Sequence, residues 1–228
     1  MSKIRFTEPN REILARRDSI INDLTRLVDP AGLITSTDEC RAYETDALTA
    51  YRKMPLAVVL PKTTEEVSAV LKYCHDTGVK VVPRGAGTSL AGGAIPSEDA
   101  VVLGLSKMNR VLAVNYDDRF IRVEAGVTNL SVTAVVAENG FFYAPDPSSQ
   151  LACTIGGNIA NNSGGAHCLK YGVTTNNLLG VRMVLIDGSI IDLGGDYLDS
   201  AGLDLLGLVV GSDVVALVKS TEVSIAKL

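Results

Sequence analysis

The sequence of 228 residues predicts an α+β domain of two lobes, each with a small mixed sheet and flanking helices. Three observations predict this fold class. A β-α-β unit fills the first half, three more strands and a helix follow it, and an alternating strand pair begins at Leu179. Because 46% of the residues are apolar, the chain is able to bury a substantial core.

The segment 10–28 is expected to be a helix between Pro9-Asn10 and Asp29-Pro30. Its apolar residues recur at helical spacing, at Ile13, Ile20, Leu24 and Leu27. We interpret residues 1–54 as a helical arm that packs against the main domain, residues 55–228.

The main domain begins with a buried strand at residues 56–60. A capping box at residues 63–66 then opens a helix that Gly78 ends, and a strand at residues 79–82 completes the β-α-β unit. Further strands are expected at 100–103, 110–115 and 120–124, a helix at 128–139, and a hairpin at 179–185 and 190–193. The two lobes then span about 55–105 and 106–228.

A loop with four glycines follows the strand at 79–82 and is suited to contact phosphate. Gly85 and Gly87 are able to adopt positive φ and aim successive backbone N–H groups at one anion, and Thr88 and Ser89 add hydroxyl donors. Neither the dinucleotide fingerprint nor the P-loop spacing fits. Taken alone, the loop is explained equally well as a tight turn without a ligand.

A second polar segment, residues 144–172, is rich in glycine, asparagine and serine and lies next to apolar strands. Such composition is typical of backbone that approaches a large ligand closely. The two loops together carry a family resemblance over about residues 55–211. The matching stretches are Pro83 to Leu90, Pro145-Asp146-Pro147, Thr154 to Ala160, Asn162, Gly164-Gly165, His167 to Gly172, Leu203 to Leu206 and Gly211-Ser212-Asp213.

In these stretches the chain resembles the FAD-linked oxidases of the vanillyl-alcohol oxidase type, and most of all the group of glycolate oxidase D subunits and FAD-dependent D-lactate dehydrogenases. The resemblance implies that the flavin lies between the two sheets. The first glycine loop would bind the pyrophosphate, and residues 145–165 would line the ribityl chain and the isoalloxazine. The implied cofactor-binding residues are Pro83, Arg84, Gly85, Ala86, Gly87, Thr88, Ser89, Leu90, Pro145, Asp146, Thr154, Gly156, Gly157, Asn158, Asn162 and Gly165.

Two details of the bound flavin follow from the same resemblance. Some relatives link FAD covalently through a histidine of the pyrophosphate loop, but this loop has none, so the FAD is expected to be non-covalent. A short helix is expected to start at Ile155, and its N-terminus would favour the negative charge of the reduced ring.

The implied function is the FAD-binding component of an oxidoreductase that oxidises a 2-hydroxy acid, glycolate or D-lactate, by hydride transfer to FAD. The electrons would pass to a partner subunit or another acceptor. The relatives' C-terminal substrate domain is absent from this chain, so no catalytic residue is assigned and the isolated chain is expected to be inactive. The alternatives are a truncated, non-catalytic flavin-binding or interaction module and, more remotely, a flavin reductase for UDP-N-acetylenolpyruvylglucosamine.

The C-terminal part departs from the family pattern. Residues 211–222 lack two glycines that relatives carry near an adenine-contacting strand and have one extra residue. This segment therefore leaves open whether the adenine end of FAD is held in the same way.

Charge and composition limit the partners. A net charge of −5 without a Lys/Arg block argues against nucleic acid. The sequence has no secretory signal and no apolar run that spans a bilayer, so a cytoplasmic location is expected, or a peripheral one at the membrane through partner subunits. No metal site is expected, because the four cysteines have no Cys-x-x-Cys spacing and are interpreted as free thiols.

Several polar residues have two readings. Arg84 either adds charge to the pyrophosphate or anchors its loop to a carboxylate. His167 is either catalytic or a structural residue bonded to a backbone carbonyl. His75 is interpreted as a surface residue, and Asp117-Asp118 as a hairpin turn.

Overall fold

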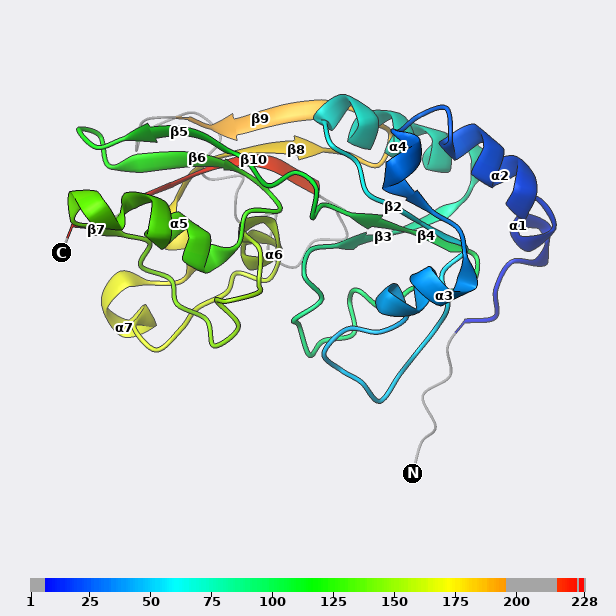
Figure 1. Ribbon diagram of the computed structural model, residues 1–228, viewed down its shortest axis with the longest axis horizontal. Coiled ribbons are helices and arrows are strands. Elements are labelled where there is room, and N and C mark those ends of the chain that lie inside the picture. The colour runs from blue at the N-terminus through cyan, green and yellow to red at the C-terminus, as the bar shows by residue number, and fades with distance from the viewer. Residues whose placement is uncertain (1–6, 196–216, 225, 228) are drawn as a thin grey trace.

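The computed structural model describes residues 7–195, 217–224 and 226–227. Its two main sheets follow one another along the long axis of the molecule, with the helices α1, α2 and α4 at one end and α5 and α7 at the other (Figure 1). The loops that follow β3 and α6 lie in the region between the sheets.

The first sheet has four strands in the order β1-β2-β4-β3. Strands β2, β4 and β3 run parallel, and β1 pairs with β2 in the antiparallel direction, so this sheet is mixed as the sequence predicts. The strands are β1 (Leu33–Ile34), β2 (Ala57–Val59), β3 (Lys80–Arg84) and β4 (Ala100–Gly104).

Helix α4 (Thr64–Thr77) connects β2 to β3 and confirms the expected β-α-β unit. The Thr63 side chain accepts a hydrogen bond from the Glu66 N–H at 3.2 Å. The Glu66 carboxylate accepts one from the Lys62 N–H, one residue before the position that a capping box uses. Gly78 ends the helix at φ 72°, where a residue with a side chain would be strained.

The single helix expected at 10–28 is wrong, because the structure has α1 (Arg11–Ala15) and α2 (Arg17–Leu24) instead. The backbone at Arg16 has φ −95° and ψ 10°, and its N–H bonds to the Ile13 carbonyl only three residues back. The Arg16 guanidinium also donates to the Thr77 carbonyl at 2.9 Å, which ties this break to the end of α4.

The second sheet has five strands in the order β5-β6-β10-β8-β9 and is antiparallel throughout. The short connections between β5 and β6 and between β8 and β9 require antiparallel pairing, so this sheet is not mixed. Its strands are β5 (Val111–Asn115), β6 (Phe120–Glu124), β8 (Leu178–Val184), β9 (Ile190–Gly194) and β10 (Leu217–Ser224).

The remaining elements lie below this sheet in Figure 1 or extend the first lobe. Strand β7 pairs with β11, antiparallel. Their bounds are α3 (Thr37–Cys40), α5 (Asn129–Val136), α6 (Ile155–Ala160), α7 (Cys168–Tyr171), β7 (Phe141–Phe142) and β11 (Ala226–Lys227). Short 3-10 turns occur at Pro30–Gly32, Arg41–Tyr43, Ala137–Asn139 and Thr174–Asn177.

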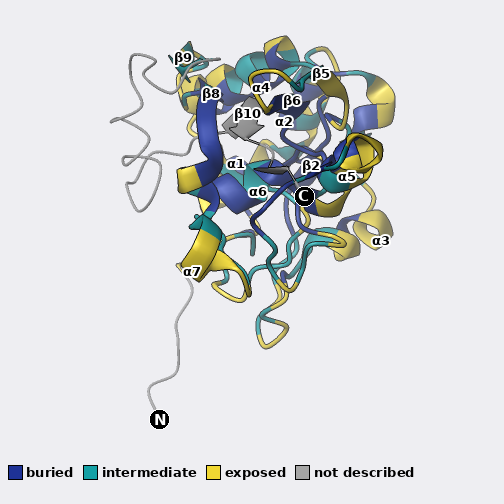
Figure 2. Ribbon diagram, turned by 90° about the vertical axis from the view of Figure 1, so that its left-hand side faces the viewer, coloured by how far each residue is buried: buried dark blue, intermediate teal, exposed yellow. Residues whose placement is uncertain are grey.

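One apolar cluster runs through both lobes. It joins Leu71 of α4, Val101 of β4, Ile121 of β6, Val181 of β8 and Ile155 of α6. Figure 2 shows this buried interior and the exposed helix α7 at its margin. The division into an arm of residues 1–54 and a domain of residues 55–228 stays a prediction.

None of the helices described by the structure is both long and apolar enough to cross a membrane. His75 is exposed on α4, as expected. Asp117 and Asp118 lie in the turn between β5 and β6, where the Asn115 side chain accepts from the Asp118 N–H at 2.9 Å.

Asp99 anchors the N-terminal segment, and its environment predicts a pH dependence of the stability. Its fully buried carboxylate accepts hydrogen bonds from Asn10 N at 2.9 Å, Ser97 Oγ at 2.6 Å and Lys80 Nζ at 2.8 Å. Burial raises the pKa of Asp99, but these hydrogen bonds outweigh burial and lower the pKa to about 2, from 3.8. A pKa depressed by folding adds stability above the unfolded value and loses it as pH falls through the folded value.

We therefore expect the free energy of unfolding in urea to fall between about pH 4 and about pH 2, and Asp99→Asn to flatten this part of the profile. The control is Asp38→Asn, because the Asp38 side chain is 93% exposed. A wild-type slope retained in Asp99→Asn would show that other carboxylates cause the loss.

Candidate functional site

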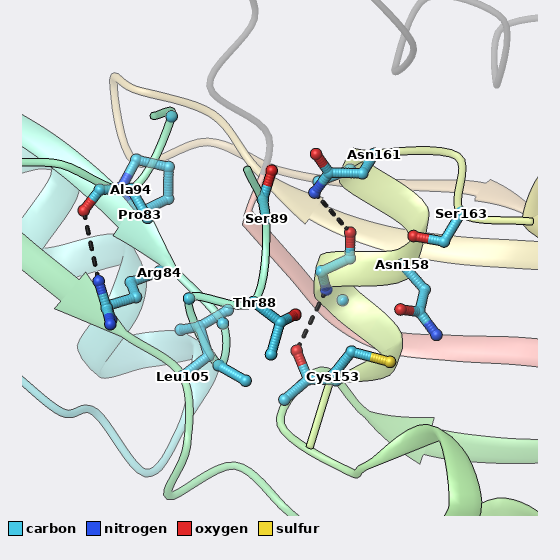
Figure 3. Close-up of a pocket in the computed structure, with 18 of the residues that line it drawn as sticks. Pro83, Arg84, Thr88, Ser89, Ala94, Leu105, Cys153, Asn158, Asn161 and Ser163 are labelled. Atoms are coloured by element: carbon cyan, nitrogen blue, oxygen red, sulfur yellow. Dashed lines mark hydrogen bonds between the residues drawn. The ribbon is translucent and has the colours of Figure 1, made fainter. Parts of the chain in front are cut away.

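A cavity of about 420 Å³ lies between the glycine loop that follows β3 and helix α6. Figure 3 shows residues of both walls, with Arg84, Thr88 and Ser89 on one side and Asn158 and Asn161 on the other. Many of the residues expected from the sequence line it, namely Pro83, Arg84, Gly85, Ala86, Gly87, Thr88, Ser89, Thr154, Gly156, Gly157 and Asn158.

Glycines bring the two walls together. A Cβ on Gly85 would lie 2.6 Å from Thr154 Oγ1, closer than side chains approach, and the α-carbon of Gly157 is next to it at 3.7 Å. Gly87 has φ 71°, the left-handed region that favours glycine. The loop is therefore free of side-chain atoms where it packs directly on the start of α6.

Helix α6 is fixed at its start and along its inner face. The Thr154 hydroxyl accepts a hydrogen bond from the Gly157 N–H at 3.2 Å and caps the helix. Ile155 and Ile159 are fully buried. A Cβ on Gly156 would lie 2.8 Å from the Ala125 Cβ, so this glycine lets α6 approach the end of β6.

Arg84 holds the loop rather than lying free in the cavity. Its Nη1 donates to the Thr45 carbonyl at 2.7 Å and to the Ala94 carbonyl at 3.5 Å, the second of which is drawn in Figure 3. Its guanidinium also lies 5.6 Å from the centre of the Tyr43 ring. Burial lowers the pKa of Arg84. Of the two readings from the sequence, anchoring is the observed one, but the partners are backbone carbonyls and not a carboxylate.

Asn158 presents an unsatisfied donor at the cavity. The residue is 1% exposed, and its Nδ2 has no hydrogen-bond partner. A buried polar group without a partner costs about 1–3 kcal/mol, so a ligand with an acceptor at this point would be stabilised. This orphaned amide is the feature of the cavity that most directly indicates a bound polar molecule.

The other expected residues, Leu90, Pro145, Asp146, Asn162 and Gly165, do not line this cavity as the structure describes it. Leu90 is 72% exposed. The Pro145 carbonyl accepts from Asn129 Nδ2 at 3.0 Å. Asn162 adopts φ 46°, and its Oδ1 accepts from both the N–H and the hydroxyl of Thr175 at 3.0 Å, so it supports the loop.

Asp146 and His167 form a hydrogen-bonded pair and are not among the residues that line the cavity. The imidazole Nδ1 lies 2.6 Å from Asp146 Oδ2, and the His167 N–H donates to Oδ1 at 3.2 Å. Burial raises the pKa of Asp146, but the bonds from His167 outweigh it and lower the pKa overall. Gly165 packs against Asp146 with no room for a Cβ. The partner of the His167 ring is thus a carboxylate, and not the backbone carbonyl of the structural interpretation.

Sequence reasoning missed part of the lining. Leu105 and Ala125 follow β4 and β6 directly, and the antiparallel order of the second sheet, which no sequence motif reveals, brings the end of β6 to this point. The remaining lining residues lie within or next to the expected loops and were not assigned to the cofactor. The missed residues are Ala91, Gly93, Ala94, Leu105, Ala125, Ser149, Cys153, Ala160, Asn161 and Ser163.

The cysteines remain free thiols in the structure. Cys74 is fully buried on α4, as expected, and burial raises its pKa to about 12. Cys153 is the cysteine that lines the cavity. No group of three or more histidine, cysteine, aspartate or glutamate side chains among the described residues could hold a metal.

Known proteins are similar to this chain in sequence or in fold. The glycolate oxidase subunit GlcD of Escherichia coli strain K12 is 47% identical over 209 residues, which cover 92% of this chain and 42% of that protein. The D-lactate dehydrogenase of Archaeoglobus fulgidus is 40% identical over 197 residues, which cover 86% of this chain and 43% of that protein. The chain thus spans less than half the length of these relatives.

Solved structures agree on the fold. An alkyldihydroxyacetonephosphate synthase superposes with a TM-score of 0.81 at 20% identity, covering 98% of this chain and 42% of that chain. p-Cresol methylhydroxylase also gives 0.81, at 18% identity, covering 96% of this chain and 44% of that chain. The α+β fold of the vanillyl-alcohol oxidase type is therefore confirmed.

A family model described as "FAD binding domain" matches residues 55–194, the part that contains both walls of the cavity. This match and the 47% identity are similarities in sequence, which the shared fold alone would not require. The chain therefore belongs to the FAD-binding domain family, and it is similar in sequence to the glycolate oxidase subunit GlcD and to D-lactate dehydrogenase.

Proposed function

We propose that the chain is the FAD-binding component of an oxidoreductase that oxidises a 2-hydroxy acid, glycolate or D-lactate, with FAD held non-covalently in this cavity. The observation that carries the proposal is the cavity itself, where two glycine-rich loops meet beside the unsatisfied Nδ2 of Asn158. The names of the relatives support the substrate class.

The residues present fit FAD. Its pyrophosphate needs several donors, which the backbone of residues 85–89, which line the cavity, and the hydroxyls of Thr88 and Ser89 would supply. Backbone from this loop approaches a ligand closely because Gly85 and Gly87 carry no Cβ. Asn158 would donate to an oxygen or nitrogen acceptor of the cofactor, and Gly156 and Gly157 leave space at the start of α6.

When bound, FAD supplies the capacity to accept a hydride. The chain's own contribution is then to orient the cofactor, to exclude water with α6 and the loop, and to hold the phosphates with dipoles instead of cations. We further propose that the electrons pass to a partner subunit or another acceptor, as the word "subunit" in the relative's name suggests.

A second candidate function follows from what lines the cavity. Among the lining residues that the structure describes, none is a histidine, aspartate, glutamate, lysine or tyrosine. Oxidation of a hydroxy acid needs a base within hydrogen-bond reach of the hydroxyl. This observation favours a flavin-binding module that has no turnover without residues from elsewhere.

An anaerobic visible spectrum of the FAD-reconstituted chain, before and after glycolate and then D-lactate, separates these two functions. Bleaching of the oxidised flavin band by one acid would show a working substrate site in this chain. Flavin that binds but stays oxidised would favour the module. Unfolding of the complex should release all the FAD into the filtrate, because its binding is proposed to be non-covalent.

Asn158→Leu is expected to change FAD affinity and stability in opposite directions. Loss of the donated hydrogen bond weakens FAD binding about tenfold, or about 1.4 kcal/mol. The free energy of unfolding of the FAD-free chain should hold or rise, because a buried unsatisfied amide is replaced by an apolar group of similar shape. FAD titration and urea unfolding measure the two effects.

The matched control is Asn139→Leu. Asn139 is exposed and bonds to the Tyr116 hydroxyl, away from the cavity. Equal FAD affinity in Asn158→Leu and the wild type would mean that this amide meets no acceptor on the cofactor.

A further inference from the structure

The segment 43–48 precedes the range that matches the FAD-binding family model, yet it contacts the phosphate loop. The Ala47 N–H donates to the Gly87 carbonyl at 2.9 Å, and the Thr45 carbonyl accepts from Arg84 Nη1 at 2.7 Å. One bond thus ends on the loop backbone and the other on the arginine that begins the loop.

The segment is itself held in a fixed turn. The Thr45 hydroxyl donates to the Tyr51 carbonyl at 2.8 Å, and Asp46 Oδ1 accepts from the Leu48 N–H at 2.8 Å. Asp46 is only 4% exposed, and its second carboxylate oxygen has no hydrogen-bond partner. A buried carboxylate with an unpaired oxygen is costly unless a positive charge is near it.

Arg84 is the positive charge that Asp46 influences, without a hydrogen bond or ion pair between the two side chains. Burial lowers the pKa of Arg84, and the charges of Tyr43 and Asp46 act in the opposite direction. The guanidinium in turn occupies the side of Gly87 from which a Cβ would project, with Cζ 2.6 Å from that position. Arg84 therefore fills the space behind the loop at the residue with positive φ, and Asp46 favours its remaining there.

We propose that Asp46 and Arg84 are positioning residues of the cofactor site: Arg84 holds the glycine loop in its phosphate-binding conformation, and the buried charge of Asp46, in the turn that bonds to Arg84 and Gly87, favours the guanidinium remaining behind the loop. This inference rests on the proposed binding of FAD in the cavity. It assigns part of the site to a segment outside the matching domain, and it gives Arg84 a role that does not depend on an ion pair with phosphate.

The alternative, in which Arg84 acts as a direct counter-charge to the pyrophosphate, predicts a different sign for one variant. In that case Asp46→Asn removes a negative charge near an anionic ligand, so FAD should bind more tightly. If Asp46 acts by positioning, the same variant releases the guanidinium from its place, and FAD should bind more weakly.

The test is a titration of the FAD-free chain with FAD, followed by flavin fluorescence, for the wild type, Asp46→Asn, Arg84→Gln and the double variant. We expect Arg84→Gln to weaken binding about tenfold to hundredfold, the effect of losing its charge-assisted hydrogen bonds, and Asp46→Asn to weaken binding by less, about threefold to tenfold. The double variant should bind FAD at most about threefold more weakly than Arg84→Gln does, because both changes remove the same interaction. Tighter or unchanged binding by Asp46→Asn, or fully additive losses, would overturn the proposal.

Arg84→Lys is the second variant and keeps the inference testable if Asp46→Asn does not fold. Lysine retains the charge but lacks the planar group that bonds two carbonyls. Positioning predicts that Arg84→Lys binds FAD nearly as weakly as Arg84→Gln, whereas restored binding would support the direct counter-charge and overturn the proposal. Hydrogen exchange of the FAD-free variants should rise in residues 85–94 and stay low in β4.

Arg182→Gln is the matched control, because Arg182 pairs with Asp192 through two bonds at 2.6 and 2.7 Å on β8 and β9, outside the cavity. It should bind FAD as the wild type does. A folded wild-type chain that fails to bind FAD would contradict the proposed function, whereas wild-type binding with unaffected Asp46 and Arg84 variants contradicts only the positioning roles.

Discussion

Gly87→Ala should abolish measurable FAD binding or weaken it by more than about a hundredfold. The added Cβ both strains the backbone and clashes with a neighbouring side chain. At φ 71°, alanine is strained by about 1–2 kcal/mol. The new Cβ would also overlap the Arg84 guanidinium, with Cζ only 2.6 Å away, and would push it from the Thr45 and Ala94 carbonyls. The loop would then lose both its own conformation and its support.

Two further glycines separate these costs. Gly78 has φ 72° with nothing within 4 Å of an added Cβ, so Gly78→Ala should lower stability through strain and leave FAD affinity unchanged. Gly93 also lines the cavity, but an added Cβ would meet nothing within 4 Å, so Gly93→Ala should change FAD binding by no more than about 0.5 kcal/mol. If Gly87→Ala binds FAD like Gly93→Ala, the loop does not need its observed backbone to bind the cofactor.

Ile155→Ala should lower the free energy of unfolding by about 2–5 kcal/mol, as other large-to-small changes in packed cores do. Ile155 is fully buried at the start of α6 and belongs to the apolar cluster that joins both lobes. Since α6 forms one wall of the cavity, this loss should also loosen the cofactor site. Urea unfolding of the FAD-free chain measures the effect.

Ile155→Val provides the graded control, with an expected loss of about 0.5–1.5 kcal/mol. Saturating FAD should raise the stability of both variants, because a ligand that binds only the folded chain stabilises it by mass action. An Ile155→Ala variant as stable as the wild type would mean that α6 is not anchored in the core.

Local patterns in the sequence were sufficient for most of the first lobe. The helix at 64–77 has a hydroxyl cap, a periodic apolar face and a terminal glycine, and all three are observed. The glycine loop at 83–90 was expected to contact a ligand, and most of it lines the cavity. Such features are predictable because the interactions that determine them lie within a few residues of one another.

Features that depend on contacts between distant parts of the chain were harder to predict from the sequence. The break at Arg16 is tied to Thr77, 61 residues away, and no periodicity reveals it. The bond between Arg84 and Thr45 spans 39 residues, so the sequence left the role of Arg84 open. Residues 211–216, part of the segment that departs from the family pattern, lie outside the described residues.

The most direct test of the central claim is a titration of the purified, FAD-free chain with FAD, with folding checked by circular dichroism. We expect one FAD to bind per chain, with a flavin spectrum that stays with the protein through gel filtration and is released on unfolding. A folded chain from which FAD elutes separately would contradict the assignment of this cavity as the flavin site.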